Sequence, residues 1–444
     1  MPGLTAEWRR IHASRRARLL AGAGADAIVV LPAAPERVRS RDTLHPYRQD
    51  SDFLYLTGFL EPESVLVLVP GRKHGEAILF CRERDPAREG WDGPRLGPER
   101  AGEALAVDDA YPIADIDDIL PGLLEGRSRV YYPLGLDAGF DLKLIGWVNR
   151  LRGRAGGNAP QEFLQLGHLL DEQRLFKSEA EVRLLQQAVD ITIAAHRAAM
   201  ATVRPGQHEY TLQAEIEREF RRNGAQPAYA SIVGAGSNGC ILHYGANASR
   251  IRKGDLVLVD AGAEYHGYAA DVSRTFPANG RFSKEQRALH DLVCAAQQAA
   301  LAQAQPGQPY AAMHTAAVAT LSDGLLSLGL LQGRLEDVVS SEAYTRFYPH
   351  KTGHWLGLDV HDVGEYRIDG ASRLLEPGMV FTVEPGLYIP PDAADVPAKW
   401  RGIGIRIEDD VLVTRTGHRV LSTALERSAD EVEALMAQAR QASA

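Results

Sequence analysis

Short apolar runs alternate with helical patterns along the first part of the chain. Three runs have the length of buried strands: residues 27–31, 64–69 and 77–80. An amphipathic segment at residues 8–20 precedes them, and Gly22 and Gly24 follow it as residues that commonly end a helix. Because strands alternate here with helical patterns, we predict an α/β domain over roughly the first 170 residues.

A domain boundary is indicated near residues 171–177, where a new helical pattern starts. Ser178 and Glu181 have the Ser-x-x-Glu spacing of a capping box, and apolar residues at helical spacing follow them. We therefore predict an amino-terminal domain over residues 1–172 and a carboxy-terminal domain over residues 173–444.

The carboxy-terminal part has a mixed α+β pattern. Further helices are predicted over residues 211–222 and 284–303. Strand-like segments bounded by turns lie between these two helices, at residues 241–244, 255–260 and 268–276. A further group lies after the second helix, within residues 379–414. The polar residues of chemical interest in this half lie at the ends of these strands.

Composition argues against some classes of function. Of the 444 residues, 45% are hydrophobic and 24% charged, and 49 basic against 58 acidic residues leave a net charge of -9. This balance disfavours general binding to nucleic acid or to anionic membranes. No apolar stretch approaches the roughly 18 residues that span a bilayer. The arginine-rich amino end also lacks the apolar core of a secretory signal.

The cysteines indicate the compartment. Cys81, Cys240 and Cys294 lie far apart and form no CxxC metal motif. Three widely spaced cysteines also make a poor disulfide framework for so long a chain. We therefore expect a protein of the reducing cytoplasm.

Acidic residues occupy strand positions where burial is expected. Asp260, Asp271, Glu384 and Glu408 each follow an apolar or strand-like segment in the carboxy-terminal half. A single carboxylate in such a place usually pairs with an arginine or caps a turn. Four in one domain would be expensive to desolvate together unless cations compensate their charges.

The expected strand register supports a metal site. If residues 256–260 and 268–275 form a hairpin about a turn at 264–267, Asp260 lies directly opposite Asp271. The two charges would repel at that distance, and a divalent ion between them would reverse the sign of the interaction. Glu384 and Glu408 fit the same logic on a second pair of strands.

Four carboxylates balance two divalent ions, and His354 is the natural nitrogen ligand. An oxygen-rich set with one imidazole favours hard ions, with Mn²⁺ above Zn²⁺. Two such ions can hold a bridging hydroxide and polarise a carbonyl group, which is the chemistry of amide hydrolysis near neutral pH. The residues alone therefore predict a dinuclear metallohydrolase.

Two other motifs receive less support from their surroundings. His350 and His354 have the spacing of a zinc-binding helix, but Pro349 and Gly353 disfavour a helix there, and no His-Glu-x-x-His motif occurs. The segment from His354 to Asp362 instead resembles a loop that directs imidazoles into a cleft. Residues 234–239 match GxGxxG, but the strand-like segment that follows disfavours a dinucleotide site.

Taken together, these residues resemble the aminopeptidase P and prolidase family. The likeness lies in the stretches around Asp260 and Asp271, in residues 350–362, in Glu384-Pro-Gly and in Glu408-Asp-Asp. Residues 47–58 resemble the amino domain of aminopeptidase P. The resemblance implies an α/β amino-terminal domain followed by an α+β "pita-bread" catalytic domain, and an enzyme that removes the residue before a proline.

The resemblance also implies roles for individual residues. The metal ligands would be Asp260, Asp271, His354, Glu384 and Glu408. Asp271 and Glu408 would bridge both ions, and Glu384 would also act as acid and base. His243 and His361 would steady the carbonyl group and the tetrahedral intermediate, and His350 and Arg406 would bind substrate. Trp91 resembles a tryptophan that a neighbouring subunit contributes in tetrameric members, so a homodimer or homotetramer is expected.

The leading hypothesis is an Xaa-Pro aminopeptidase that uses a hydroxide bridging two divalent ions. Mn²⁺ is the expected metal, with Zn²⁺ and Co²⁺ as alternatives. The expected partners are peptides with proline in the second position, and neither nucleic acid nor membrane. A prolidase that cleaves Xaa-Pro dipeptides and a non-catalytic pita-bread module that binds peptides, proteins or nucleic acid remain alternatives. Creatinase-like hydrolysis without metal is disfavoured by the complete ligand set.

Overall fold

The chain forms two compact units. The computed structural model describes residues 5–442, and the chain divides into Met1–Arg174 and Leu175–Ala444. Each unit has its own hydrophobic core and is described below by itself. Among residues 5–442, no helix combines the length and the apolar character needed to traverse a lipid bilayer.

The amino-terminal unit is built on a mixed six-stranded sheet. Its strands, in spatial order, are β6 (Asp109–Pro112), β5 (Ala77–Cys81), β4 (Val65–Leu68), β1 (Ala27–Pro32), β7 (Arg129–Tyr131) and β8 (Glu162–Leu164). The central pairs β1–β4 and β4–β5 are antiparallel, and the outer pairs are parallel. Strands β4 and β5 are buried along their whole length, which explains why they appear in the sequence as continuous apolar runs.

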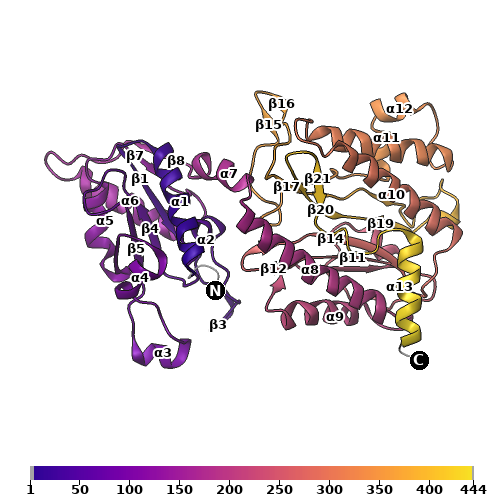
Figure 1. Ribbon diagram of the computed structural model, residues 1–444, viewed down its shortest axis with the longest axis horizontal. Coiled ribbons are helices and arrows are strands. Elements are labelled where there is room, and N and C mark those ends of the chain that lie inside the picture. Colours follow the sequence, from indigo (N-terminus) through magenta and orange to yellow (C-terminus); the bar gives the residue numbers. More distant parts are fainter. Residues whose placement is uncertain (1–4, 443–444) are drawn as a thin grey trace. The chain divides into compact units, whose positions relative to one another are not determined.

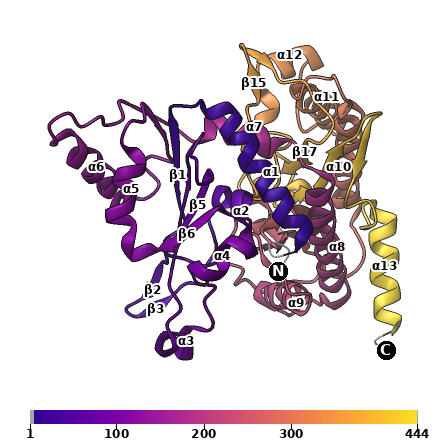
Figure 2. The same cartoon turned by 60° about the vertical axis from the view of Figure 1, so that its left-hand side comes forward.

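Helices cover both faces of this sheet. The helices of this part of the chain are α1 (Ala6–Ala23), α2 (Ser51–Thr57), α3 (Pro86–Asp92), α4 (Pro98–Leu105), α5 (Ile116–Leu124), α6 (Ala138–Arg152) and α7 (Gly167–Leu175), of which α3 buries no residue and lies away from the sheet (Figure 1). Figure 2 shows α5 and α6 on one face and α1 on the other. A small hairpin, β2 (Val38–Ser40) with β3 (Thr43–Leu44), completes the unit. The predicted α/β character, the three strands and the first helix with its Gly24 cap are confirmed.

The carboxy-terminal unit places several small antiparallel sheets between helices. The helices are α8 (Glu179–Thr202), α9 (Glu209–Arg222), α10 (Lys284–Gln303), α11 (Ala311–Ser327), α12 (Leu335–Ser340) and α13 (Ala429–Ala442). Figure 1 shows α8 and α9 along one side of the strands and α10 and α11 along the other. The predicted capping box of α8 is present, since Ser178 and Glu181 cap each other. This is the expected α+β arrangement.

The strands of this unit pair in two groups. The first comprises β9 (Gln226–Pro227), β10 (Ile232–Ala235), β11 (Leu256–Ala261), β12 (Ala263–Tyr265), β13 (Tyr268–Ala269) and β14 (Val272–Pro277). The second comprises β15 (Arg367–Ile368), β16 (Ala371–Ser372), β17 (Val380–Val383), β18 (Gly386–Tyr388), β19 (Gly404–Arg406), β20 (Asp409–Val413) and β21 (His418–Val420). The main sheets have the orders β10-β11-β14 and β17-β20-β21.

The predicted register of the first hairpin is wrong, because the centre of the turn lies one position further along the chain. The turn residues are His266 and Gly267, both with positive φ, so Tyr265 pairs with Tyr268. As a result, Asp260 lies opposite Ser273 and not opposite Asp271. In an antiparallel pair, residues two apart on one strand share a face, so Asp271 becomes a diagonal neighbour of Asp260. The two carboxylates remain on the same face.

A second correction concerns the strand predicted over residues 241–244. A short 3-10 helix over Gly236–Cys240 precedes these residues, and they continue as an irregular loop. Ile241 is 53% exposed, so it does not contribute to a buried strand face. Within residues 5–442, no α-helix opens directly after the GxGxxG segment either. A dinucleotide site therefore stays excluded, although for a different reason from the one expected.

Candidate active site

The predicted site residues, apart from Trp91, gather around one cavity of the carboxy-terminal unit. This cavity has a volume of about 740 Å³. The site residues that line it are His243, Asp260, Asp271, His350, His354, His361, Glu384, Arg406 and Glu408. Trp91 lies on α3 of the amino-terminal unit and is 88% exposed, so its assignment to a neighbouring subunit's site stays a prediction.

Asp260 and Asp271 face each other across a tyrosine hydroxyl. The Oη atom of Tyr229 lies 2.6 Å from Asp260 Oδ1 and 2.5 Å from Asp271 Oδ1. A hydroxyl has one hydrogen and can donate to only one of these carboxylates at a time. Burial raises the pKa of Asp260, the Arg406 guanidinium opposes the rise, and the charge of Asp271 adds to it. The positive charge of Arg406 therefore does not fully offset the burial of the Asp260 carboxylate beside Asp271.

His354 presents one ring nitrogen to the carboxylates. Its Nδ1 lies 3.0 Å from the Trp355 carbonyl oxygen, whereas Nε2 lies 3.3 Å from Asp271 Oδ2 and 3.6 Å from Glu384 Oε1. A metal-binding histidine commonly donates its other N–H to a carbonyl in this way. Burial disfavours the charged ring, but the hydrogen bond to Asp271 and the charges of Asp271 and Glu384 raise the pKa of His354 to about 9.

A glycine brings His354 against strand β17. A Cβ atom on Gly353 would lie 1.9 Å from the carbonyl oxygen of Thr382, so only glycine fits. This close approach lets the backbone N–H of Thr382 donate to the His354 carbonyl at 2.9 Å. The residue that disfavoured a helix in the sequence therefore also fixes the position of the imidazole.

Glu384 and Glu408 meet across a second strand pair, as expected. Strand β17 pairs with β20 so that Val383 faces Asp409, and one further step places Glu384 opposite Glu408. Burial raises the pKa of Glu384 to about 7, with His354 opposing. Burial and the charge of Asp271 raise the pKa of Glu408 well above its ordinary value.

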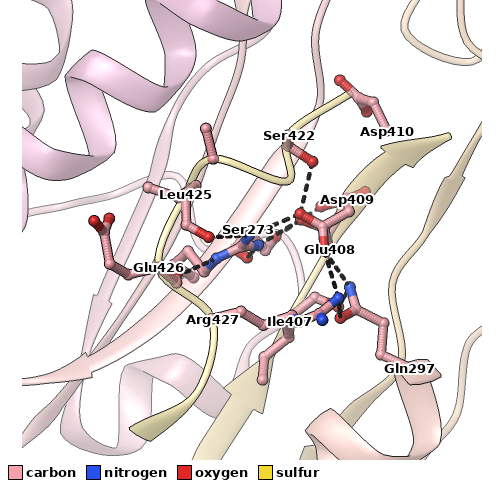
Figure 3. Close-up of polar contacts among 12 residues, drawn as sticks. Ser273, Gln297, Ile407, Glu408, Asp409, Asp410, Ser422, Leu425, Glu426 and Arg427 are labelled. Atoms are coloured by element: carbon pink, nitrogen blue, oxygen red, sulfur yellow. Dashed lines mark hydrogen bonds and ion pairs between the residues drawn. The ribbon is translucent and has the colours of Figure 1, made fainter. Parts of the chain in front are cut away.

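The backbone that carries Glu408 is fixed by a buried arginine. Arg274 donates from Nη1 to the Glu408 carbonyl at 2.7 Å and from Nη2 to Asp409 Oδ1 at 2.7 Å. Asp409 also accepts from Ser422 and Gln297 (Figure 3). Asp409 therefore supports the strand, while the neighbouring Glu408 accepts from Ser273 Oγ at 2.8 Å on the cavity side.

These residues fit divalent cations. Asp271, His354 and Glu408 each offer a ligand atom, and these atoms lie within 4.8 Å of one another. Asp260 and Glu384 complete a set of four carboxylates and one imidazole around the cavity. Burial first, and the neighbouring carboxylates after it, raise the pKa of Asp260, Glu384 and Glu408, and bound cations would offset both effects.

The substrate-binding and histidine candidates surround this acidic centre. Arg406 donates from Nη2 to Asp260 Oδ2 at 2.6 Å and from Nη1 to the Tyr388 hydroxyl at 3.0 Å. His350 Nε2 lies 2.8 Å from the same hydroxyl. The ring centroid of His361 lies 4.3 Å from that of His354. Sequence reasoning missed Tyr388, because a single tyrosine at the end of a strand gives no local sign of a partner.

A buried ion pair holds the segment next to His361. Lys177 Nζ lies 2.9 Å from Asp362 Oδ2, and both side chains are only 1% exposed. The Asp362 amide also donates to the Trp355 carbonyl at 2.9 Å, which closes the loop between His354 and His361. Sequence reasoning missed this pair as well, since 185 positions separate its members.

Replacing Lys177 by methionine is expected to lower the free energy of unfolding by about 3–5 kcal/mol, because the Asp362 carboxylate stays buried without its cation. The measurement is denaturant unfolding followed by tryptophan fluorescence. The double variant Lys177→Met/Asp362→Leu is the matched control, and it should recover much of the loss because it removes both charges. A single variant as stable as the parent chain would contradict this account of the pair.

Comparisons with known proteins identify the family of the chain. The model of metallopeptidase family M24 matches residues 183–415, and that of the aminopeptidase P N-terminal domain matches residues 12–131. The Xaa-Pro aminopeptidase of Escherichia coli is 47% identical over 412 residues, covering 92% of this chain and 93% of that protein. Human Xaa-Pro aminopeptidase 3 is 36% identical over 421 residues, covering 94% and 82%.

Solved structures give the same result. Aminopeptidase PepP of Pseudomonas aeruginosa has a TM-score of 0.96 and 54% identity, covering 98% of this chain and 99% of that one. Escherichia coli aminopeptidase P with the inhibitor Pro-Leu has a TM-score of 0.94 and 45% identity, with the same coverage.

The chain belongs to metallopeptidase family M24, a family of metal-dependent peptidases with the pita-bread fold. Within it, the activity is that of an Xaa-Pro aminopeptidase. The predicted family, fold class and activity are confirmed.

Proposed function

We propose that this enzyme removes the first residue from peptides with proline in the second position, with two divalent cations held by Asp260, Asp271, His354, Glu384 and Glu408. The observation that carries the proposal is that four carboxylates, two of them buried and two half-buried, line one cavity together with His354, and that ligand atoms of Asp271, His354 and Glu408 lie within 4.8 Å of one another. When bound, the cations would lower the pKa of a water molecule and polarise the carbonyl group before proline. Asp271 and Glu408 are the proposed bridging ligands.

Glu384 is the proposed acid and base. Its carboxylate lines the cavity with Oε1 3.6 Å from His354 Nε2, so it lies among the other proposed ligands, where a carboxylate can accept a proton from water and release it again. Its carboxylate would take the proton of the attacking water and pass it to the nitrogen of the departing proline. The Thr382 hydroxyl lies 3.3 Å from Glu384 Oε1, which helps to orient the side chain.

The remaining residues bind and orient the peptide. Asp260 would hold the free α-amine, which limits cleavage to the first peptide bond. His243 and His361 would donate hydrogen bonds to the carbonyl oxygen as negative charge develops on it. His350 and Arg406, joined through the Tyr388 hydroxyl, would shape the pocket for the proline ring.

Mn²⁺ is the proposed metal, because oxygen-rich ligation with one imidazole suits a hard cation. Zn²⁺ and Co²⁺ are alternatives, and a zinc-substituted form of the Escherichia coli enzyme has been solved with product.

We also propose a homodimer or homotetramer in which Trp91 reaches a neighbouring site. The proposed functional domains span residues 1–172 and 173–444. The three free thiols support a cytoplasmic location.

A substrate comparison tests the activity and its alternative. Ala-Pro-Ala, Ala-Pro and Ala-Ala-Ala are incubated with the Mn²⁺-loaded enzyme, and released alanine is measured by mass spectrometry. We expect release from Ala-Pro-Ala and little from Ala-Ala-Ala. Faster cleavage of Ala-Pro than of Ala-Pro-Ala would instead identify a prolidase, and no cleavage of any of these peptides would favour a binding module.

His361→Ala is expected to remove about 2–4 kcal/mol of transition-state stabilisation, as the loss of an oxyanion donor does. The kcat/KM for Ala-Pro-Ala should therefore fall by roughly 30- to 1000-fold. His74→Ala, which changes an exposed histidine of the amino-terminal unit, is the matched control. Near-normal kinetics for His361→Ala would show that its assigned role is wrong.

A further inference from the structure

The segment that carries His243 has no regular strand or α-helix to fix its position. After the 3-10 helix Gly236–Cys240, residues 241–249 follow an irregular path, and the His243 side chain is exposed where it lines the cavity. A hydrogen-bond donor on such a segment is useful only if it stays in place, because a displacement of about 1 Å can cost about a hundredfold in rate. The described contacts show how this segment is held.

One buried carboxylate contacts the longer segment 235–249, from the last residue of β10 onward, at its start, middle and end. Glu209, the first residue of α9, is fully buried. Its Oε1 accepts from the Ala235 amide and from Asn238 Nδ2, both at 2.8 Å. Its Oε2 accepts from the Tyr244 hydroxyl at 2.9 Å and from the Ser249 amide at 2.7 Å.

These four donors are neutral, and together they use the acceptor capacity of both carboxylate oxygens. Hydrogen bonds to an ionised acceptor are about twice as strong as those between neutral groups. The carboxylate also lies in the first turn of α9, where the helix dipole favours a negative charge. Four hydrogen bonds to one side chain therefore bind the segment tightly.

The neighbours of His243 set the direction of its side chain. Leu242 and Tyr244 both pack against the small hydrophobic cluster formed by Ile232, Leu258 and Tyr388. His243 lies between these two inward-packed residues and lines the cavity, and Leu242 reaches the cavity as well. The Glu209–Tyr244 hydrogen bond fixes one of these two inward residues directly.

We propose that Glu209 is a positioning residue for His243. It acts through the segment 235–249 and touches neither the substrate nor the metal ligands. The inference rests on the proposed function, which assigns His243 to the scissile carbonyl. It adds that the geometry of this contact is set by a carboxylate at the start of α9, outside the cavity lining.

The test is a double-mutant cycle with Glu209→Gln and His243→Ala. Glutamine keeps the size of the side chain but replaces one acceptor oxygen by an NH₂ group. This group would face two of the four existing donors and could not accept a hydrogen bond from them. In the parent enzyme we expect Glu209→Gln to lower kcat/KM for Ala-Pro-Ala by about tenfold to a hundredfold. In the His243→Ala background, the same change should lower it by less than about twofold, because its effect is transmitted through His243.

Two further variants guard against a simple folding defect. Tyr244→Phe removes one of the four hydrogen bonds, and we expect a smaller loss of kcat/KM, about threefold to tenfold, that also disappears in the His243→Ala background. Tyr132→Phe is the matched control, because it removes a tyrosine–carboxylate hydrogen bond of 2.8 Å within the amino-terminal unit. That control should leave kcat/KM unchanged. Bound metal, measured for every variant, should be equal.

Hydrogen exchange gives a readout that does not depend on catalysis. Glu209→Gln should speed amide exchange in residues 235–249 and leave α10 unchanged. Equal kinetic losses in both backgrounds, or unchanged exchange in the segment, would overturn the proposal. Normal kinetics of His243→Ala itself, with faster exchange in Glu209→Gln, would instead show that the anchoring is present but that the proposed function misassigns His243.

Discussion

Replacing Glu384 by glutamine is expected to lower kcat by at least about 1000-fold, since glutamine can neither accept nor release the transferred proton. The fold should remain, because burial already disfavours the Glu384 charge and a neutral amide relieves it. The measurement is steady-state hydrolysis of Ala-Pro-Ala at saturating Mn²⁺, together with thermal unfolding of both proteins.

Metal content decides how this result is interpreted, because Glu384 is also a proposed ligand. If Glu384→Gln still binds metal as the parent enzyme does, the loss of turnover belongs to proton transfer. If metal is lost, ligation explains it. A kcat within tenfold of the parent value, with metal bound, would show that another group handles the proton.

Removing the metal with a chelator is expected to abolish release of the first residue, and adding Mn²⁺ should restore it. The structure explains both halves of this expectation. Without cations, burial and the neighbouring negative charges raise the pKa of Asp260, Glu384 and Glu408, so the centre lacks the charges that would balance its carboxylates.

Recovery is expected because hydrogen bonds from the protein hold several ligands in place. Arg406 holds Asp260, Ser273 holds Glu408, and Trp355 accepts from the His354 ring. Elemental analysis must verify the removal, and chelator saturated with Mn²⁺ beforehand is the control. Full activity after verified removal would contradict a metal-dependent reaction.

The sequence predicted the elements whose signal is local. Strands β4 and β5 are buried on both faces and appear as continuous apolar runs, and Ser178 with Glu181 marks the start of α8. The ligand types were also visible, because acidic residues interrupt otherwise apolar strands. Helix α11 was missed, although Met313, Ala317, Leu321 and Leu325 are buried at helical spacing, because alanine and threonine weaken the contrast between its faces.

The errors came from contacts that lie outside the local pattern. The alternation in Ile241-Leu-His-Tyr244 resembles a strand, but Glu209, more than thirty positions earlier, binds the segment and replaces strand pairing. Lys177, Tyr229 and Glu209 were not identified as contributors to the site, because each acts on residues distant in sequence. Only the folded chain brings these partners together.

The hairpin register was misplaced because the turn uses an unusual residue. His266 has a φ of 52° and Gly267 a φ of 87°, as a two-residue type I′ turn requires. Glycine is expected there, whereas histidine adopts this conformation less often, though more often than most residues. The error moved Asp260 relative to Asp271 by two positions without changing the face that they share.

That exposed turn has a consequence for how the chain tolerates change in length. Side chains alternate between the faces of a strand, so a change in length between Tyr265 and Tyr268 that the turn itself does not absorb would shift one arm of the hairpin by one step. Asp271 would then point away from Asp260, and both proposed cations would lose the carboxylate proposed to bridge them. The length of a surface connection that touches nothing in the cavity thus helps to set the geometry of the proposed metal ligands.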